Sequence, residues 1–328
     1  EPQLSTPGLS VKGLSYNHAV LGDAIIESQW VQANKAVTID ATVAQDNGRT
    51  SYINGEIFPM NDSLDFKFKA DKINVGFMEP FMSAFAKDVS GFASGDARLW
   101  GTFKFIDMVG DIYAEDLRLK IDFTNTYYTA TDSVHLKPGY IEFDNIDLYD
   151  AYGNNAKLGG YLKHYCFKRP EYNFQITNAK NFLCYDETEK RSPIWWGRIF
   201  GNGKATVEGV PGTVKITVNM STAPKSNFTF VLSDAEVANE YNFITFRDRN
   251  KVNGTYIEPA IDPKLEKVKR LEAIIEERKR QDNTPTIYNM EIIVDANPDV
   301  DMTLVMDPIG GDCIKAHGNG NIRMTYNS

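Results

Sequence analysis

Histidine is the first residue type to examine for chemistry, because imidazole acts as a base and as a metal ligand near neutral pH. The chain has four histidines, His18, His135, His164 and His317, and none has the spacing of a metal motif such as HExxH. We interpret each as a surface or rim residue.

A nucleophile needs a base beside it and a third group to orient that base. Cys166 lies near His164 on the same face of an expected strand, but the sequence suggests no third partner. The GxSxG motif of a serine nucleophile is also missing. We therefore expect a chain that is not an enzyme, with no catalytic residue and no cofactor.

Aspartates gather in two places where calcium could bind. The first group is Asp144, Asp147 and Asp150, and the second is Asp295, Asp299, Asp301 and Asp307. Neither has the order of an EF-hand, with glycine at the sixth position. Solvated turns are the simpler interpretation and weak calcium binding is the alternative, so the sequence predicts no defined metal site.

The three cysteines, Cys166, Cys184 and Cys313, lack CxxC spacing, which argues against a zinc site or a redox motif. We expect buried free thiols. A bridge between Cys166 and Cys184 stays open as an alternative for an oxidising compartment.

Composition excludes several classes of protein. The chain has 328 residues, of which 42% are hydrophobic, enough to form a core, so disorder is not expected. The formal net charge of -9 argues against a nucleic-acid partner. No apolar run approaches the roughly 18 residues of a membrane-spanning helix, and the start of the chain has no signal-peptide pattern, so we expect this chain to be soluble.

The elements that must position any site are strands. Between Asp116 and Phe123 the apolar residues Leu117, Leu119, Ile121 and Phe123 alternate with polar ones, which is typical of a strand with one buried face. The same alternation recurs along the chain. Short turns such as 137–139 and 210–212 link these segments, and this indicates antiparallel neighbours.

Glycines and two helical stretches complete the pattern. Glycines open or end strand-like segments in 95–101, 203–209 and 318–324, where they permit bends that turn a flat sheet into a trough or barrel. Residues 77–89 place Phe81, Phe85 and Val89 at helical spacing, and this short helix could plug an open end of a sheet. Residues 262–280 predict a longer, highly charged helix, read as a surface excursion packed by one face.

Three stretches resemble the C-terminal part of the TamB-type translocation and assembly modules of Bacteroidetes, in the wider AsmA-like group. They are 144–167, which reads DNIDLYDAYGNNAKLGGYLKHYCF, 242–246, and 306–324. With the weaker stretch 91–101, the resemblance covers roughly residues 20–328. Ala316 stands where the family often has glycine, the family continues beyond Ser328, and its usual N-terminal membrane anchor is missing here.

The resemblance implies a periplasmic, taco-like β-groove that shields acyl chains between the inner and outer membranes or assists outer-membrane protein assembly. The implied partners are phospholipid or fatty acyl chains, an outer-membrane assembly protein of the Omp85 type, and an inner-membrane anchor in the missing N-terminal part. It also implies that the full-length protein is anchored in the inner membrane.

We therefore predict an all-β fold: an elongated, curved, mostly antiparallel groove with one short helix and one longer helical excursion. The expected segments are 1–110, with the short helix near 77–89, then 111–250, 251–285 and 286–328. The predicted lining of the groove is apolar and comes from the segments 111–250 and 286–328. It comprises Leu117, Leu119, Ile121, Phe123, Ile141, Phe143, Tyr172, Phe174, Ile176, Val214, Ile216, Val218, Phe228, Phe230, Ile292, Val294, Met302, Leu304, Ile322 and Met324.

Two other functions stay open. A scaffold could bind outer-membrane protein strands by adding them to a sheet edge. A β-sandwich could bind carbohydrate, as the 12% of aromatic residues suggests.

Overall fold

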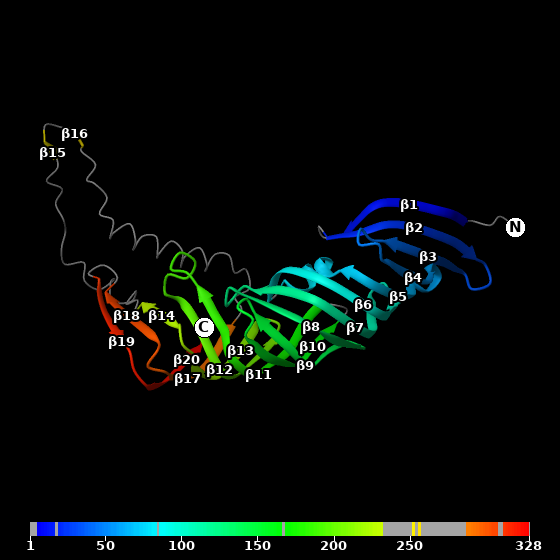
Figure 1. Ribbon diagram of the computed structural model, residues 1–328. Coiled ribbons are helices and arrows are strands. Elements are labelled where there is room, and N and C mark those ends of the chain that lie inside the picture. Colours follow the sequence, from blue (N-terminus) through cyan, green and yellow to red (C-terminus); the bar gives the residue numbers. More distant parts are fainter. Residues whose placement is uncertain are drawn as a thin grey trace.

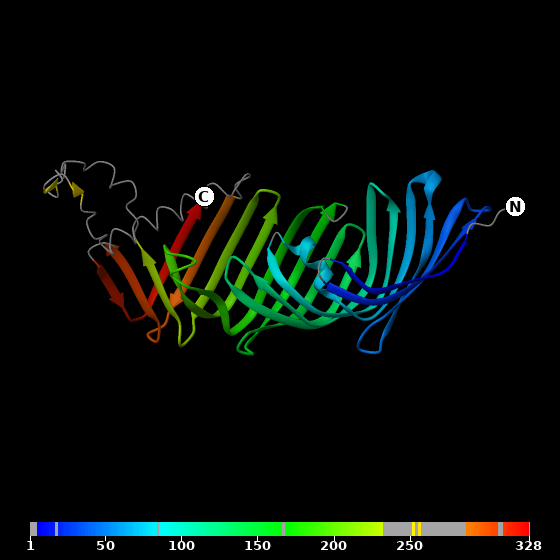
Figure 2. The ribbon, with the colours of Figure 1, turned by 90° about the horizontal axis from the view of Figure 1, so that it is seen from above.

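The computed structural model describes residues 5–16, 19–83, 85–165, 168–231, 251–252, 255–256, 287–307 and 311–327. Most of these residues lie in β-strands, which confirms the all-β prediction. Among them, eighteen strands form one sheet, and the two-residue strands β15 and β16 pair separately. Figures 1 and 2 show the large sheet as a single long, curved layer, whereas a sandwich would need two packed sheets.

The first twelve strands follow one another through short connections, and each pairs antiparallel with the next. They are β1 (Ser5–Tyr16), β2 (Ala19–Val31), β3 (Ala36–Ala44), β4 (Thr50–Phe58), β5 (Ser63–Asn74), β6 (Ala86–Thr102), β7 (Phe105–Ile121), β8 (Thr126–Lys137), β9 (Tyr140–Asp150), β10 (Asn155–Tyr165), β11 (Lys168–Glu187) and β12 (Trp195–Val210).

The remaining strands are β13 (Thr213–Thr222), β14 (Asn227–Val231), β15 (Lys251–Val252), β16 (Thr255–Tyr256), β17 (Ile287–Ala296), β18 (Asp301–Asp307), β19 (Asp312–Ala316) and β20 (Gly320–Asn327). The long strand β12 pairs with both β13 and β14. These two pair in parallel with β17 and β18, which then pair antiparallel with β20 and β19. Parallel pairing needs a long return connection, and residues 232–286 provide its length.

The predicted helix at 262–280 lies outside the described residues, as do His18, Cys166 and the stretch 242–246.

The helical segments that the structure describes are short. They are η1 (Pro59–Asn61), η2 (Val75–Met78) and α1 (Glu79–Met82). The helix predicted over 77–89 therefore ends early, and Val89 belongs to β6. Asp88 has a left-handed backbone with φ of 53°, which breaks a helix but fits the bulge that it forms in the strand.

One face of the sheet is apolar and the other is polar, because paired residues of neighbouring strands project to the same side. Leu119 of β7 pairs with Tyr128 of β8, and Leu117 pairs with Ala130. Between them in β7, Arg118 projects to the opposite side, where its guanidinium lies 4.3 Å from the centre of the Tyr127 ring. We call the side with Leu119 and the residues in register with it the apolar face, and the opposite side the polar face.

Bulges keep the apolar residues on their face where the alternation changes phase. In β9, Ile141 and Phe143 share a face, and one extra residue then precedes Ile146 and Leu148. The extra residue allows all four side chains to lie on the apolar face. Asn145 occupies the bulge with φ of 54°, a conformation that asparagine tolerates better than most residues.

Equivalent left-handed residues interrupt other strands. They are Lys72, Asp88, Asp116 and Asn178, with φ between 50° and 53°, and each lies at or beside a shift in strand register. Bulges bend a strand and increase its local twist. The sheet is thereby bent along its whole middle region.

Glycine permits close approach on the apolar face. A Cβ atom at Gly209 would lie 2.1 Å from the Tyr172 ring, so this ring rests directly on the glycine backbone. At Gly203, with φ of 143°, a Cβ atom would meet the carbonyl oxygen of Asn219 at 2.5 Å. Both positions belong to the predicted segment 203–209, where the glycines do mark close approach.

The largest core lies where the sheet curls onto itself. Tyr128 of β8 and Phe182 of β11 stack with ring centres 5.1 Å apart, although three strand spacings, roughly 14 Å, separate their strands along the ladder. Both side chains are buried, together with Leu148, Ala156 and Met220. The second half of β11 therefore folds over the apolar face.

Polar contacts fix this curl. The Tyr128 hydroxyl donates to the carbonyl oxygen of Leu183 at 2.9 Å, and the Asp186 amide donates to the carbonyl oxygen of Thr124 at 3.0 Å. The buried Asp150 carboxylate accepts from the backbone amides of Tyr152, Asn154 and Leu183 at 2.8–2.9 Å. This carboxylate joins the turn after β9 to β11.

The bulge at Asn145 can be tested with two substitutions. We expect Asn145→Val to lower the free energy of unfolding by about 1–2 kcal/mol, because a β-branched residue is strained at positive φ. Asn145→Gly, the matched control, should change it by less than about 0.5 kcal/mol. Urea denaturation followed by circular dichroism measures both, and equal losses would contradict the role of the backbone conformation.

The curled core and the open part of the apolar face should respond differently to loss of an aromatic ring. Phe182→Ala should cost about 3–5 kcal/mol of unfolding free energy, because the side chain is buried. Phe230→Ala should cost only about 1 kcal/mol, since Phe230 is half-buried. Comparable losses in urea denaturation would show that both regions are equally closed.

Candidate functional site

The predicted lining residues fall on the apolar face, with one exception. Ile176, Val218, Ile292 and Met324 form part of one register row that crosses β11, β12, β13, β17 and β20, with Ala205 completing it. The adjacent rows hold Tyr172 with Val214, Phe174 with Ile216, and Val294 with Ile322. The register thus brings together residues that are far apart in the sequence.

The other lining residues extend the same face in both directions. Phe228 pairs with Met302, and Phe230 pairs with Leu304. The residues on the earlier strands are Leu117, Leu119, Ile121, Ile141 and Phe143. Phe123 differs, because β7 ends at Ile121 and Phe123 lies in the following turn with 43% of its surface exposed.

None of these predicted residues is fully buried. Phe123 and Met324 are exposed, and the others are half-buried. A closed core would bury large apolar side chains completely, as it does with Phe182 at 2% exposure. The apolar face is therefore a concave surface that is only partly covered by the protein itself.

Two parts of this face are covered. The segment 75–82, formed by η2 and α1 and called the strap below, packs on β6 and β7, where Val75 and Met82 adjoin Leu117 and Leu119. Ile121, Ile176 and Val218 pack against the curled core. The remaining predicted residues belong to neither cluster.

Part of the apolar face was missed by sequence reasoning. Phe66 pairs with Gly55 and Leu99, and Phe68 pairs with Ile53 and Ala97, so the face continues through β4, β5 and β6. The alternation of Leu64, Phe66 and Phe68 was visible in the sequence and could have identified it. Trp195, which pairs with Phe230, also lies on this face. It follows a turn, so no alternation of apolar and polar residues precedes it that could have identified it.

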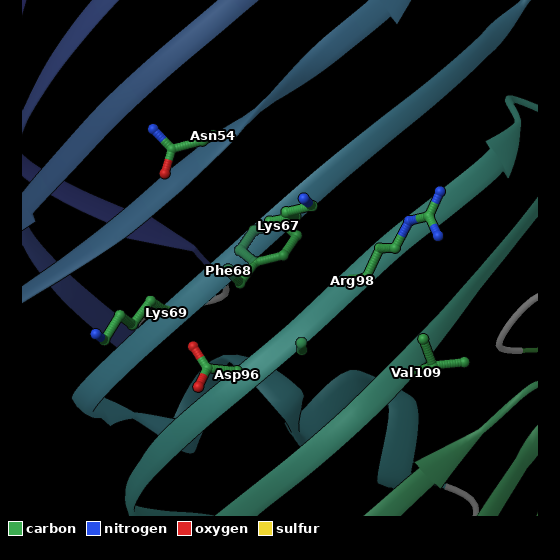
Figure 3. A pocket seen from close by; sticks show the side chains of 8 residues that line it. Asn54, Lys67, Phe68, Lys69, Asp96, Arg98 and Val109 are labelled. Carbon is green, nitrogen blue, oxygen red and sulfur yellow. The ribbon is translucent and has the colours of Figure 1, made fainter.

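The polar face carries rows of charged and amide side chains. Asn54, Lys67, Arg98 and Val109 are in register across β4 to β7, and they line a shallow hollow of about 320 Å³ (Figure 3). Arg98 donates two hydrogen bonds to the Asp65 carboxylate, at 2.8 and 2.6 Å, and this contact lowers the pKa of Asp65. Such exposed pairs contribute little to stability but keep this face hydrated.

The candidate chemical residues do not converge. His135 contacts Asp111 at 2.6 Å and His317 contacts Asp301 at 3.0 Å, on separate parts of the sheet. In the described ranges, no group of three or more histidine, cysteine, aspartate and glutamate side chains could hold a metal ion.

The cysteine and aspartate questions have structural answers. Cys184 is a free thiol, and burial raises its pKa to about 12, which keeps it protonated. Cys313 is free but exposed, so the expectation of a buried thiol is wrong there. Asp147 pairs with Lys157 at 2.8 Å, while Asp150 accepts backbone amides as described above. Asp147 thus forms an ion pair between neighbouring strands, and Asp150 stabilises the turn after β9.

Among the residues that the structure describes, no helix has both the length and the apolar character required to cross a membrane.

Comparison with known proteins identifies a family. Residues 144–328, more than half of the chain, match the family described as TamB C-terminal domain. No curated protein and no solved structure matches the chain. The matched region contains most of the predicted lining residues, namely those on the strands from β11 to β20. The chain belongs to the TamB family.

Proposed function

We propose that this chain is a non-enzymatic segment of a conduit in the bacterial envelope, which carries lipid acyl chains along its apolar face. The observation that carries the proposal is the half-buried state of the apolar residues. They lie on one concave face, whose rows continue across strands that are remote in sequence. A surface of this kind in water favours an apolar occupant.

The driving force of such an occupant would be the removal of methylene groups from water. Each buried methylene contributes about 0.8 kcal/mol, so roughly 15 of them would contribute on the order of 10 kcal/mol. Because this energy depends on area rather than on direction, an acyl chain could slide along the rows without losing it. The fixed polar groups of a catalytic or small-molecule site are not required.

Family membership supports the same role. TamB proteins are translocation and assembly modules of the cell envelope, which supports a periplasmic location. Our fuller proposal is that phospholipid or fatty acyl chains occupy the face, with an outer-membrane assembly protein of the Omp85 type at one membrane. The full-length protein would be anchored in the inner membrane by a segment N-terminal to this chain.

A second candidate, capture of outer-membrane protein strands, has one observation in its favour. Among the described strands, β1 pairs only with β2, and β20 pairs only with β17. Each therefore has one edge that could accept an added strand. This candidate would be favoured if an extended peptide bound to the chain, if substitutions that block the free edge of β1 or β20 abolished this binding, and if fatty acid left it unchanged.

The first experiment is lipid extraction. The purified chain should yield phospholipid or fatty acid by mass spectrometry, at a level well above that from an unrelated β-protein prepared in parallel. Delipidated protein should then bind a pyrene-labelled hexadecanoic acid. Absence of both extracted lipid and rebinding would overturn the conduit.

A pair of substitutions on β18 separates the two faces. Leu304→Asp places a carboxylate on the apolar face, and we expect it to weaken binding of the pyrene-labelled acid by about tenfold or more, because the charge requires hydration. Thr303→Asp, on the polar face beside Lys315, is the control and should leave binding unchanged. Both variants should keep the far-ultraviolet circular dichroism of the parent. Equal binding by both would show that the acid lies elsewhere.

A further inference from the structure

Phe85 makes a contact between two walls of the curved sheet. It lies just before the first residue of β6, and its ring centre is 5.7 Å from those of both Tyr172 and Phe174 on β11. Five strand spacings, roughly 24 Å, separate β6 from β11 along the ladder. The contact therefore crosses the concave side of the sheet.

The rings around Phe85 form one cluster, which we call the aromatic bar: Phe85, Phe143, Tyr172 and Phe174. Tyr172 and Phe174 stack with centres 5.0 Å apart, and Phe143 meets Phe174 edge to face at 5.8 Å. Phe143, Tyr172 and Phe174 are predicted lining residues, so the bar stands on the apolar face itself. Tyr172 is seated on Gly209, which leaves its ring little room to retreat.

Two other parts of the apolar face are covered by the protein itself. The strap covers Leu117 and Leu119, and the curled core covers the apolar face near Phe182. Apolar rows continue on both sides, through Phe66 on β5 and through Ile216 on β13. The aromatic bar therefore lies between these two stretches of the apolar face, on the route of an acyl chain that moves from one to the other.

Hydrogen bonds in and around the strap fix the backbone next to Phe85. The Asn74 side chain accepts from the Gly76 amide at 2.8 Å, and the Glu79 carboxylate accepts from the Val89 amide at 3.1 Å. The Phe85 amide donates to the carbonyl oxygen of Met82 at 3.0 Å. These bonds fix the backbone, whereas the ring is held by aromatic contacts, which are individually weak.

We propose that Phe85 is a gate in the conduit: its ring closes the apolar face against Tyr172 and Phe174, and rotates away when an acyl chain passes. This rests on the proposed function. The bar divides the face into two stretches, and passage between them is limited by release of one ring rather than by opening of the sheet. Phe85 thus controls the movement of acyl chains along this face.

The test measures transfer of pyrene-labelled hexadecanoic acid from the loaded, full chain to excess albumin by stopped-flow fluorescence. Phe85→Ala should speed transfer by roughly five- to tenfold, the change that loss of one or two aromatic contacts produces. Phe85→Trp should slow it. Phe85→Leu keeps an apolar side chain without a ring, so it should also speed transfer and serves if the alanine variant does not fold.

Phe105→Ala is the matched control. Phe105 also meets an aromatic ring at 5.7 Å, that of Tyr165, but both rings are more than half exposed near the turns at the edge of the sheet. This variant should transfer the acid at the parent rate. Normal loading with unchanged transfer in Phe85→Ala and Phe85→Leu would overturn the gate and leave the conduit standing. Failure of the parent to load any acid would overturn the proposed function instead.

Discussion

The structure depends on a constraint of strand geometry: side chains alternate between two faces, and one inserted residue reverses the assignment of all those that follow. In this chain, bulges change the face to which the following side chains project in several strands. The odd-numbered apolar residues before Asn145 and the even-numbered ones after it share a face only because that residue forms a bulge. Without such resets, the apolar face would end in the middle of the strands.

Curvature and function are connected through the same residues. Bulges and close-packed glycines bend the sheet toward its apolar side, and this brings Tyr128 onto Phe182 and Phe85 onto Tyr172. A flat sheet with the same alternation would expose a wide apolar patch to water and invite aggregation. The bent sheet shelters this patch from both sides, and the remaining exposure is what makes an acyl ligand reasonable.

Much of this could be predicted from the sequence, because alternation is a local property. The assignment of Ile216, Val218 and Leu304 to strands needed only their neighbours in the chain. The contact of Phe85 with Tyr172 could not be predicted, since it depends on the summed bends of five strand pairs. The helix predicted over 77–89 ends at Met82, and Val89 lies in β6 instead. Spacing alone could not show this, because a bulge in a strand can bring Val89 to the apolar face just as a helical turn would.

The first twelve strands pair in chain order, and outside the contacts made by the strap and the curled core this has a consequence for the length of the molecule. Where no such contact ties distant strands together, a hairpin could be inserted or lost without reversing either face. Each such event would change the length by two strand spacings, about 10 Å. Related chains could thus match envelopes of different width by the number of their hairpins.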